Sequence, residues 1–392
     1  MKHYDIVISG GAMAGTTLAL ALSQRTQGAL SIAIIEAHET EYAEHPGFDA
    51  RAIALSHGTA DILQDFQLWD DVASVASEIK HIHVSDRGHA GMTEIASHDI
   101  SVPALGYVVE LADIGRLFHQ RIKQSDNIDL YCPDSVATLQ RYQDRVEIVL
   151  TSGERLKCRL LVAADGAFSP CCDSVGLEQK EVDFAQVAVI ANVVCQQAHQ
   201  GRAFERFTSH GPIALLPMSD NRLSLVWCLP SNDATRVMAL NEQAFLTELQ
   251  SAFGWRMGRI EAAGKRSSYP LRLRYRSQII SHRFAAVGNA SQALHPIAGQ
   301  GFNLGIRDIA SLVEEIEKQQ NDPGIYSTLS AYQARRLADR NATIELTSGL
   351  VSLFSNDWLS MRLGRNIGLF CADSLPLLKQ PLLNRTLGLV ER

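Results

Sequence analysis

Apolar residues along the chain fall into two patterns, short unbroken runs and runs with helical spacing. Unbroken runs at residues 4–9 and 30–35 predict buried parallel strands, and the segment between them, 16–24, has the spacing of a helix. A third apolar run at 284–287 leads through a glycine-containing loop into a helical pattern that starts near residue 302. Strands that end in glycine turns ahead of helices are typical of doubly wound α/β proteins.

The pattern becomes strand-like in the middle of the chain. Residues 185–194 predict a long apolar strand, and residues 213–218 and 222–229 predict a hairpin around the polar turn 219–221. A helix is predicted at 241–253. Three aromatic side chains of this block could line a pocket or belong to the core, and the pattern leaves both open: Phe204, Phe207 and Trp227.

Length and composition narrow the class of protein. The 392 residues suggest two domains or one with a large insertion, and 46% hydrophobic with 20% charged residues describe a globular chain. A formal net charge of -7 argues against a general nucleic-acid binder, because nothing supplies a phosphate-neutralising surface. The seven cysteines include no CxxC pair, so we expect reduced thiols. Without a signal peptide or an apolar run of ~18 residues, we expect a cytoplasmic protein, with contact at the inner-membrane surface left open.

Histidines near residue 80 raise the question of a metal. His81 and His83 share one face of the alternating segment 79–85, and His89 follows nearby. No carboxylate or cysteine completes a ligand set at metal-binding spacing, so we expect no metal site.

The first glycine turn carries a nucleotide-binding pattern. The strand at 4–9 is followed by Gly10, Gly11 and Ala12, then Gly15, and the second strand closes on Glu36. Gly10 permits the tight turn, Gly15 lets the helix pack on the strand, and Glu36 would accept from a ribose hydroxyl. Ala12 replaces the middle glycine and adds one methyl group beside the pyrophosphate. An ordinary strand–turn–helix is the alternative, and the acidic residue suits FAD or NAD better than NADP.

Two arginines after this turn could reach a phosphate. Arg51 precedes a run that predicts a helix through Leu63, and its guanidinium could clamp a phosphate bidentately. A solvated loop arginine is the alternative. Arg116 lies in a helical pattern after Val108 and could contact a ribose or a phosphate.

A second candidate turn follows a buried strand at 160–164. Asp165 and Gly166 come directly after it, and short strands with turns over 128–161 predict a β-meander before it. A carboxylate at the C-terminal end of a parallel strand stands where ligands bind in doubly wound sheets. Alone, such a turn would mean little; beside two other glycine turns it indicates a ligand contact.

The third turn begins at Gly288 and Asn289 and continues through His295 and Pro296 into the last predicted helix. Its glycines let backbone N–H groups approach a flat, electron-rich ligand, and the helix N-terminus adds the positive end of its dipole. We interpret this ligand as a flavin. The remaining candidate contacts of the loop are Gly299, Gly301, Phe302 and Asn303.

Together the three turns resemble the three fingerprints of the class A flavoprotein aromatic hydroxylases, whose type fold is that of p-hydroxybenzoate hydroxylase. Within that family the chain is most similar to the ubiquinone-biosynthesis hydroxylases. The similar runs are HPGFDARAIALSHGT (45–59), IHVSDRGHAG (82–91), GRAFERFTSHGPIALLPM (201–218) and LHPIAGQGFNLGIRD (294–308). The chain departs from the family where Asn289 replaces an Asp, where Gln292 replaces a His, and where Cys172 stands near the usual Arg after the Asp-Gly motif.

The resemblance implies an FAD-dependent monooxygenase. NADH or NADPH would reduce FAD, O2 would then form a flavin C4a-hydroperoxide, and this would hydroxylate the ring of a polyprenylated phenol. His295 is a candidate general base, with a backbone-bonded loop histidine as the alternative, and Pro296 would stiffen the loop over the flavin. A multi-enzyme ubiquinone-biosynthesis complex is a further expected partner. The alternatives are a non-catalytic flavin-bound subunit, which Asn289 and Gln292 keep open, and a reductase on the same fold.

The predicted fold is α/β: a Rossmann-like, three-layer FAD-binding domain interrupted by a β-rich substrate domain and followed by C-terminal helices. Helix-period apolar residues in the last segment could pack in the core, line a path for the prenyl tail, or meet a partner or the bilayer surface. The expected division is FAD-binding domain at 1–75, 101–180 and 281–335, substrate domain at 76–100 and 181–280, and C-terminal helices at 336–392.

Overall fold

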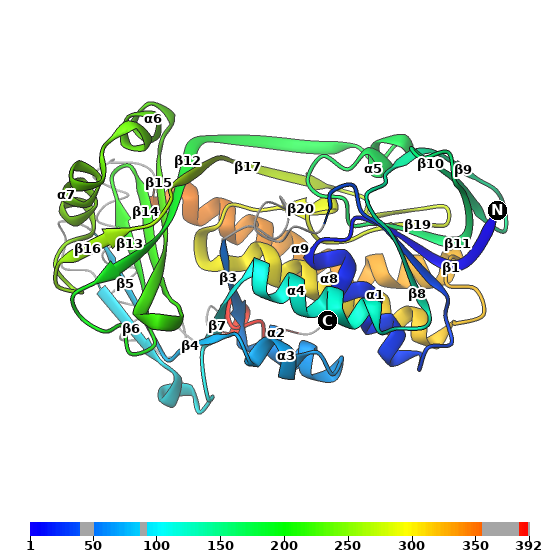
Figure 1. Cartoon of the computed structure of the whole chain (residues 1–392), viewed down its shortest axis with the longest axis horizontal. Coiled ribbons are helices and arrows are strands. Elements are labelled where there is room, and N and C mark those ends of the chain that lie inside the picture. The colour runs from blue at the N-terminus through cyan, green and yellow to red at the C-terminus, as the bar shows by residue number, and fades with distance from the viewer. Residues whose placement is uncertain (40–50, 87–91, 355–383, 391–392) are drawn as a thin grey trace.

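The computed structural model describes residues 1–39, 51–86, 92–354 and 384–390 (Figure 1). Two of the similar runs extend beyond these ranges, at 45–50 and 87–91, and so do His89 and the apolar residues at 355–383. The cysteines within the described ranges are free thiols, as the sequence predicts. Two large sheets stand at opposite ends of the molecule, and strands β12 (Gln179–Cys195) and β17 (Ser267–Arg276) run between them along the upper edge of Figure 1.

The sheet at the right of Figure 1 carries the first glycine turn. Its centre is β1 (Lys2–Ser9), which pairs in parallel with β2 (Ile32–Ile35) on one side and with β11 (Arg155–Ala163) on the other. Consecutive residues of β1, including Ile6 and Val7, are fully buried, so both faces of this sheet are covered. The parallel order β19-β11-β1-β2-β8 confirms the predicted Rossmann-like architecture. The remaining strands are β8 (Ile128–Tyr131), β9 (Val136–Arg141), β10 (Val146–Leu150), β18 (Ile280–Ser281) and β19 (Phe284–Ala286).

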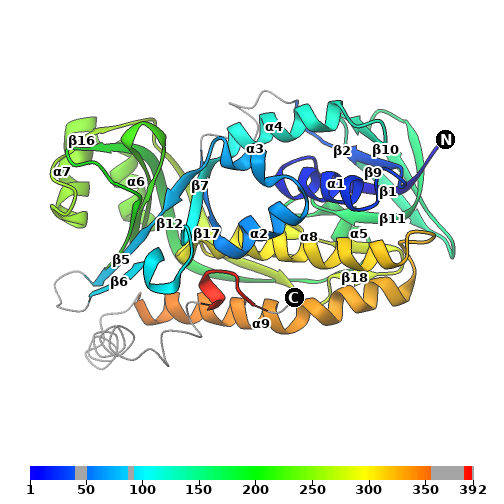
Figure 2. The same cartoon turned by 90° about the horizontal axis from the view of Figure 1, so that it is seen from below.

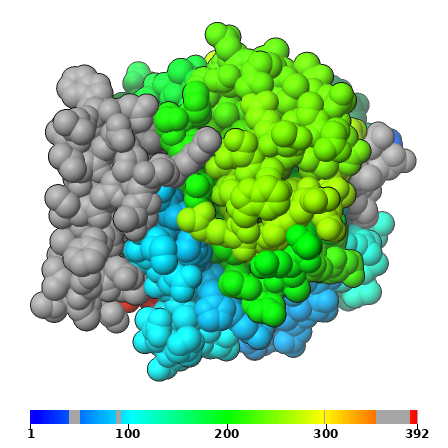
Figure 3. Space-filling view, turned by 90° about the vertical axis from the view of Figure 1, so that its left-hand side faces the viewer, coloured from blue at the N-terminus to red at the C-terminus, as the bar shows by residue number. Residues whose placement is uncertain are grey.

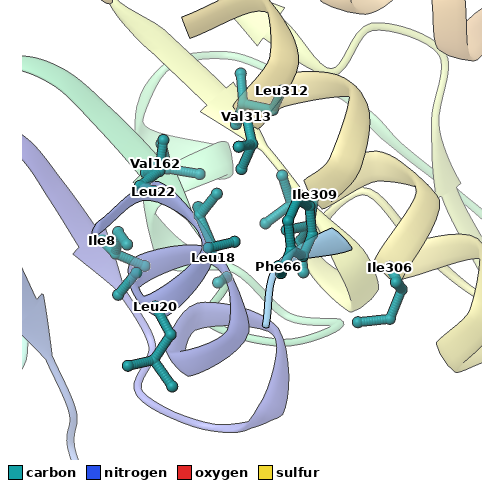
Figure 4. Close-up of a cluster of buried hydrophobic side chains, with 14 of the residues drawn as sticks. Ile8, Leu18, Leu20, Leu22, Phe66, Val162, Ile306, Ile309, Leu312 and Val313 are labelled. Atoms are coloured by element: carbon teal, nitrogen blue, oxygen red, sulfur yellow. The ribbon is translucent and has the colours of Figure 1, made fainter. Parts of the chain in front are cut away.

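Three helices form the layer on one face of this sheet. They are α1 (Met13–Arg25), α4 (Leu111–Lys123) and α8 (Gln300–Lys318), and α1 packs against both others. Leu18 of α1 and Ile309 of α8 point into the shared cluster shown in Figure 4, and both are fully buried. Burying one such side chain contributes ~1.5–3 kcal/mol, so the cluster fixes the N-terminal ends of α1 and α8 relative to the sheet.

The sheet at the left of Figure 1 has nine strands in the order β20-β17-β12-β15-β14-β13-β5-β6, with β16 beside β12. The predicted hairpin is confirmed, because β14 (Gly211–Pro217) and β15 (Arg222–Pro230) pair in antiparallel fashion. Helices α6 (Ser231–Ala239) and α7 (Glu242–Phe253) lie at this end of the molecule, which faces the viewer in Figure 3. The other strands are β5 (His81–Asp86), β6 (Met92–Ala96), β13 (Arg202–Thr208), β16 (Ile260–Ala263) and β20 (Gln292–Ala293). His81–Asp86 and Met92–Ala96 thus join this sheet, and we propose the predicted division into domains on that basis.

One predicted helix is partly wrong. The run after Arg51 begins as strand β3 (Ala52–Ser56), because it pairs in antiparallel register with β7 (Gly106–Glu110). Helix α2 (His57–Asp65) starts only after Ser56, whose hydroxyl accepts from the Thr59 backbone N–H as an N-cap. Strands β3 and β7 form a third, smaller sheet together with β4 (Ser77–Ile79). Two short helices are α3 (Trp69–Ala73) and α5 (Pro170–Ser174).

Helix α9 (Tyr326–Phe354) runs alongside α8 and is joined to it by buried charges (Figure 2). Arg336 is fully buried, and its guanidinium donates to Asp308 at 2.8 Å and to Asp339 at 2.7 Å. Arg307 donates to the same Asp339 oxygen at 2.8 Å. Burial raises the pKa of Asp339, but the two guanidiniums lower it by more, so the carboxyl stays ionised. Among the described residues, no helix is long and apolar enough to cross a membrane.

Candidate functional site

Residues from both large sheets line one cavity of about 910 Å³. This volume is at the upper end of the roughly 300–1,000 Å³ that ligand pockets occupy. The three predicted glycine turns form one part of its wall, and an apolar face of the nine-stranded sheet forms another. The cavity therefore brings together segments that lie far apart in the sequence.

The first glycine turn forms the part of the wall between β1 and α1. Gly10 has φ +104°, and a Cβ there would lie 2.4 Å from the carbonyl oxygen of Ala164, so only glycine fits. A Cβ on Gly15 would lie 1.8 Å from the carbonyl oxygen of Gly10, which explains the close packing of helix on strand. Gly10 and Ala12 line the cavity directly, whereas Gly15 supports the turn from behind.

Glu36 ends β2 beside this turn. Its carboxylate is buried, accepts from the Gly11 backbone N–H at 2.6 Å and from the His38 backbone N–H at 2.9 Å, and lines the cavity. A carboxylate has about four lone-pair positions and accepts more than one hydrogen bond at a time. The residue stands where the sequence predicted a ribose acceptor.

Asp165 and Gly166 stand at the C-terminal end of β11 and also line the cavity. One carboxylate oxygen of Asp165 accepts from the Cys171 backbone N–H at 3.4 Å, and the other has no hydrogen-bond partner among the described residues. Burial raises the pKa of Asp165, although hydrogen bonds from Ser169 and Cys171 oppose the shift. A buried oxygen without a partner at a cavity wall is a position that a ligand hydroxyl would satisfy.

The third turn places Gly288, Asn289, Gly299, Gly301 and Phe302 on the cavity wall. The first N–H groups of α8 belong to this stretch and have no partner within the helix. A Cβ on Gly301 would meet no atom within 4 Å, and the same holds for Gly166, so open space lies in front of both backbones. This end of α8 is suited to bind a group that carries negative charge.

The structure does not bring every predicted residue to the cavity. Arg51 lines it, but Arg116 pairs with Asp113 on an exposed part of α4 and is not among the lining residues. Asn303 is buried, and its side chain accepts from the Ser56 backbone N–H at 2.8 Å and donates to the Gly299 carbonyl at 2.7 Å. Asn303 therefore joins β3 to the start of α8 and is engaged by the protein itself.

His295 also turns away from the cavity, although its neighbour Pro296 lines it. One ring nitrogen accepts from the Ile297 backbone N–H at 3.1 Å, so the other carries the proton and donates to Gln186 at 3.2 Å. Burial lowers the pKa of His295 to about 4. This geometry favours the loop-histidine alternative over the general base.

Gln292, which stands where the resembled family has a histidine, belongs to the buried charge cluster. Its amide nitrogen donates to Asp308 at 2.5 Å, and its amide oxygen accepts from Arg340 at 2.6 Å. All three side chains are almost fully buried. An amide can donate at one end and accept at the other, and this links the loop before His295 to α8 and α9.

The sheet side of the cavity contains residues that the sequence analysis did not select. One of them is Glu205 of β13, which shares a face of the strand with Ala203 and Phe207, and an acidic residue between two apolar ones on that face was the available signal. Of the three aromatic side chains left open, Phe204 lines the cavity, Phe207 packs in a cluster with Ile297, and Trp227 lies in the core against Phe245.

Comparison with known proteins adds to this geometry. A family model described as FAD binding domain matches residues 3–347. The chain belongs to this family. A ubiquinone hydroxylase, UbiL of Rhodospirillum rubrum, is 33% identical over 99% of this chain and 90% of that protein. The 3-demethoxyubiquinol 3-hydroxylase of Escherichia coli is 29% identical over 98% of each chain. Among solved structures, p-nitrophenol 4-monooxygenase PnpA of Pseudomonas putida shares the fold, with a TM-score of 0.81 and 16% identity over 99% of each chain.

The cavity fits FAD, the cofactor of this family. Gly10 and Ala12 lie at the N-terminus of α1, where a pyrophosphate would be held, and Glu36 offers the ribose acceptor. Asp165 offers a buried oxygen without a partner, and the open space before Gly301 leaves room for a flat ring beside α8. The residues therefore suit both the nucleotide end and the flavin end of FAD.

Proposed function

We propose that this protein is an FAD-dependent monooxygenase that uses NADH or NADPH and O2 to hydroxylate the aromatic ring of a polyprenylated phenol in ubiquinone biosynthesis, as a 2-octaprenyl-6-methoxyphenol hydroxylase would. The observation that supports it most is the single cavity in which the dinucleotide turns meet an apolar sheet face. The relatives named as ubiquinone hydroxylases support the substrate class.

The cofactor half of the cavity would act by binding and orientation. Glu36 and Asp165 would accept from hydroxyl groups of the cofactor, and Arg51 would lie near its phosphates. The N-terminus of α8 stabilises nearby negative charge by ~0.3–1 kcal/mol, and by more when the charge is partly buried. FAD, when bound, supplies the redox chemistry between NADH or NADPH, O2 and the phenol. Asn289 would contribute an uncharged hydrogen bond where relatives of the resembled family carry an Asp.

The sheet half would hold the phenol and exclude water. Its wall includes Ile82, Ala214 and Val226, and beside them Leu216 and Leu271. Such a surface cannot hydrogen-bond to water, so the aromatic ring and the first part of a prenyl chain would displace water at a gain of ~0.8 kcal/mol per buried CH2 group. Pro296 would limit the motion of the loop between the two halves.

A polyprenylated substrate also bears on partners and location. Because such a molecule partitions into a bilayer, the proposal includes peripheral contact with the inner membrane and membership in a multi-enzyme complex of ubiquinone biosynthesis. Co-sedimentation of the protein with vesicles that contain a polyprenylated phenol tests the membrane contact, and absence from the pellet would count against it.

The central test starts from the absorption spectrum of the purified protein. We expect bound or bindable FAD, slow anaerobic reduction by NADH or NADPH, and faster reduction once a short-chain prenylated methoxyphenol is added. With 18O2 the phenol should gain one labelled oxygen atom. A protein without a flavin site would refute the proposal, and a flavin whose reduction ignores the phenol would favour a non-catalytic subunit.

A matched pair of variants tests the cofactor half. Glu36→Gln removes the charge of the predicted ribose acceptor, and we expect FAD affinity to fall by roughly tenfold or more, since a hydrogen bond to a charged group is worth ~1.5–3 kcal/mol. Glu39→Gln makes the same change at an exposed residue outside the cavity and should bind FAD like wild type. Equal affinities for all three proteins would exclude the assigned role of Glu36.

A further inference from the structure

Glu205 is an acidic side chain on an otherwise uncharged part of the cavity wall. Among the described residues that β5, β13, β14 and β15 contribute to the cavity, Glu205 alone is charged. The strand register explains its surroundings: Glu205 stands opposite Val84 of β5 on one side and Ala214 of β14 on the other, and Ala214 pairs with Val226. One row across the sheet therefore places a carboxyl between aliphatic side chains.

The carboxyl of Glu205 has no partner within the described part of the chain: no hydrogen bond or ion pair reaches it from there. Burial raises its pKa to about 7. Desolvating a carboxyl without a hydrogen bond or a counter-charge is costly, and a residue that serves only packing would be apolar here. A group of this kind at a cavity wall is suited to bind a ligand that brings its own donor.

We propose that Glu205 binds the hydroxyl group of the phenol substrate and accepts its proton. This inference rests on the proposed function, which supplies the phenol. In the step, the phenol O–H bond breaks, the proton moves to a carboxylate oxygen of Glu205, and the electron pair stays on the phenol oxygen. The resulting phenolate is richer in electrons at the ring carbons ortho and para to that oxygen, which prepares the ring for oxygen transfer. The aliphatic neighbours Val84 and Ala214 offer the carboxyl no hydrogen bond, so its basicity is available to the substrate.

Other polar groups near Glu205 do not replace it in this role. Cys228 of β15 lines the same wall, but burial and the neighbouring carboxyl raise the pKa of its thiol, so it stays protonated. Tyr269 and Arg272 of β17 line the cavity as donors, and neither is a base in its usual form. The elements beside β13 contribute only aliphatic groups to the row.

The test measures binding of two probes to the full-length, FAD-loaded protein. One probe is a 2-methoxyphenol that carries a short prenyl chain, and the other is its methyl ether, which lacks the phenol proton. Dissociation constants come from quenching of flavin fluorescence in wild type, in Glu205→Gln, and in the control Glu261→Gln. Glu261 is exposed on β16 of the same sheet and outside the cavity, so the control makes the same change without touching the site.

We expect Glu205→Gln to weaken binding of the phenol by roughly 10- to 100-fold while leaving binding of the methyl ether unchanged. The affinity of wild type for the phenol should also rise between about pH 6 and pH 8, as Glu205 ionises, and this rise should disappear in the variant. Equal losses for both probes, or no loss for either, would overturn the inference.

The two proposals can fail separately. If wild type binds FAD and hydroxylates the phenol, yet Glu205→Gln binds the phenol as tightly as wild type does, only the role of Glu205 is refuted. If wild type takes up FAD but binds no phenol, the proposed substrate class and the role of Glu205 both fall.

Discussion

Substitution of Asp339 by alanine should show how much of the stability depends on the buried charges between α8 and α9. Asp339 is almost fully buried and accepts from Arg307 at 2.8 Å and from Arg336 at 2.7 Å. Both guanidiniums are themselves buried, so water cannot replace the lost carboxylate. In the variant, Asp308 would be left, among the residues that the structure describes, to balance the two arginines and Arg340.

Two estimates of the cost agree. Hydrogen bonds to charged groups contribute ~1.5–3 kcal/mol each, and the two from the arginines are lost, together with a longer one from the Thr343 hydroxyl at 3.5 Å. Removing one partner of a buried ion pair costs roughly 3–5 kcal/mol, because the other charge stays buried. We therefore expect Asp339→Ala to lower the free energy of unfolding by about 3–5 kcal/mol, and the Tm by about 4–6 °C for a chain of 392 residues.

Thermal unfolding followed by circular dichroism measures the effect, with a surface pair as the control. Glu248 also accepts two bonds from one arginine, Arg236, at 2.7 Å and 2.6 Å, but this pair is partly exposed. Glu248→Ala should cost no more than about 1 kcal/mol. If the two variants lower Tm equally, the argument from burial is wrong.

Three further outcomes are expected. Glu205→Gln should raise the free energy of unfolding of the FAD-loaded protein by up to about 3 kcal/mol at pH 8 and by little at pH 5. The raised pKa of Glu205 means that folding disfavours its carboxylate, and this destabilisation grows as pH rises from the usual pKa of a glutamate toward about 7. A gain in stability that does not depend on pH would contradict this. His295→Gln should leave the pH profile of kcat/KM unchanged above about pH 6, since burial already holds the pKa of His295 at about 4; loss of one limb of the profile would restore it as the general base. Gly301→Ala should lower FAD affinity while leaving the Tm of the FAD-free protein within about 2 °C, because a Cβ at this position meets no atom within 4 Å. Unchanged FAD binding would show that the cofactor lies elsewhere.

The sequence analysis selected cofactor contacts from local backbone geometry, and several of them line the cavity. Gly10, Asp165 and Gly288 were found because each follows an apolar strand, and strand ends of a parallel sheet meet at one edge. The strand at Ala52–Ser56 was missed because its identity depends on pairing with residues some fifty positions later. Local patterns carry little information about such pairings.

Besides strand pairing, the burial of individual polar side chains could not be predicted from local sequence patterns. Arginines on α8 and α9 have the spacing of a solvated helix face, yet Arg336 is fully buried because two helices place their charged faces together. Asn303 and His295 lie within the flavin-like motif but face the protein, since neighbouring backbone groups need their hydrogen bonds. Glu205 was overlooked because its apolar surroundings come from strands on either side of β13.

The pairing of β19 with β11 has a consequence for synthesis of the protein. Leu161 of β11 stands beside Phe284 of β19, and β19 pairs with β18, so two strands made late complete a sheet whose other strands emerge early. The turn at Gly10 and the acceptor Glu36 leave the ribosome long before the loop at Gly288 exists. A nascent chain can hold at most the nucleotide end of FAD until α8 has followed. Until β19 has followed, the edge of β11 at Leu161 to Ala163 lacks its partner strand, whereas β10 already covers Arg155 to Cys158. Slow translation of residues 181–280, which separate β11 from β19, should therefore lengthen the period in which this edge of β11 needs protection by a chaperone.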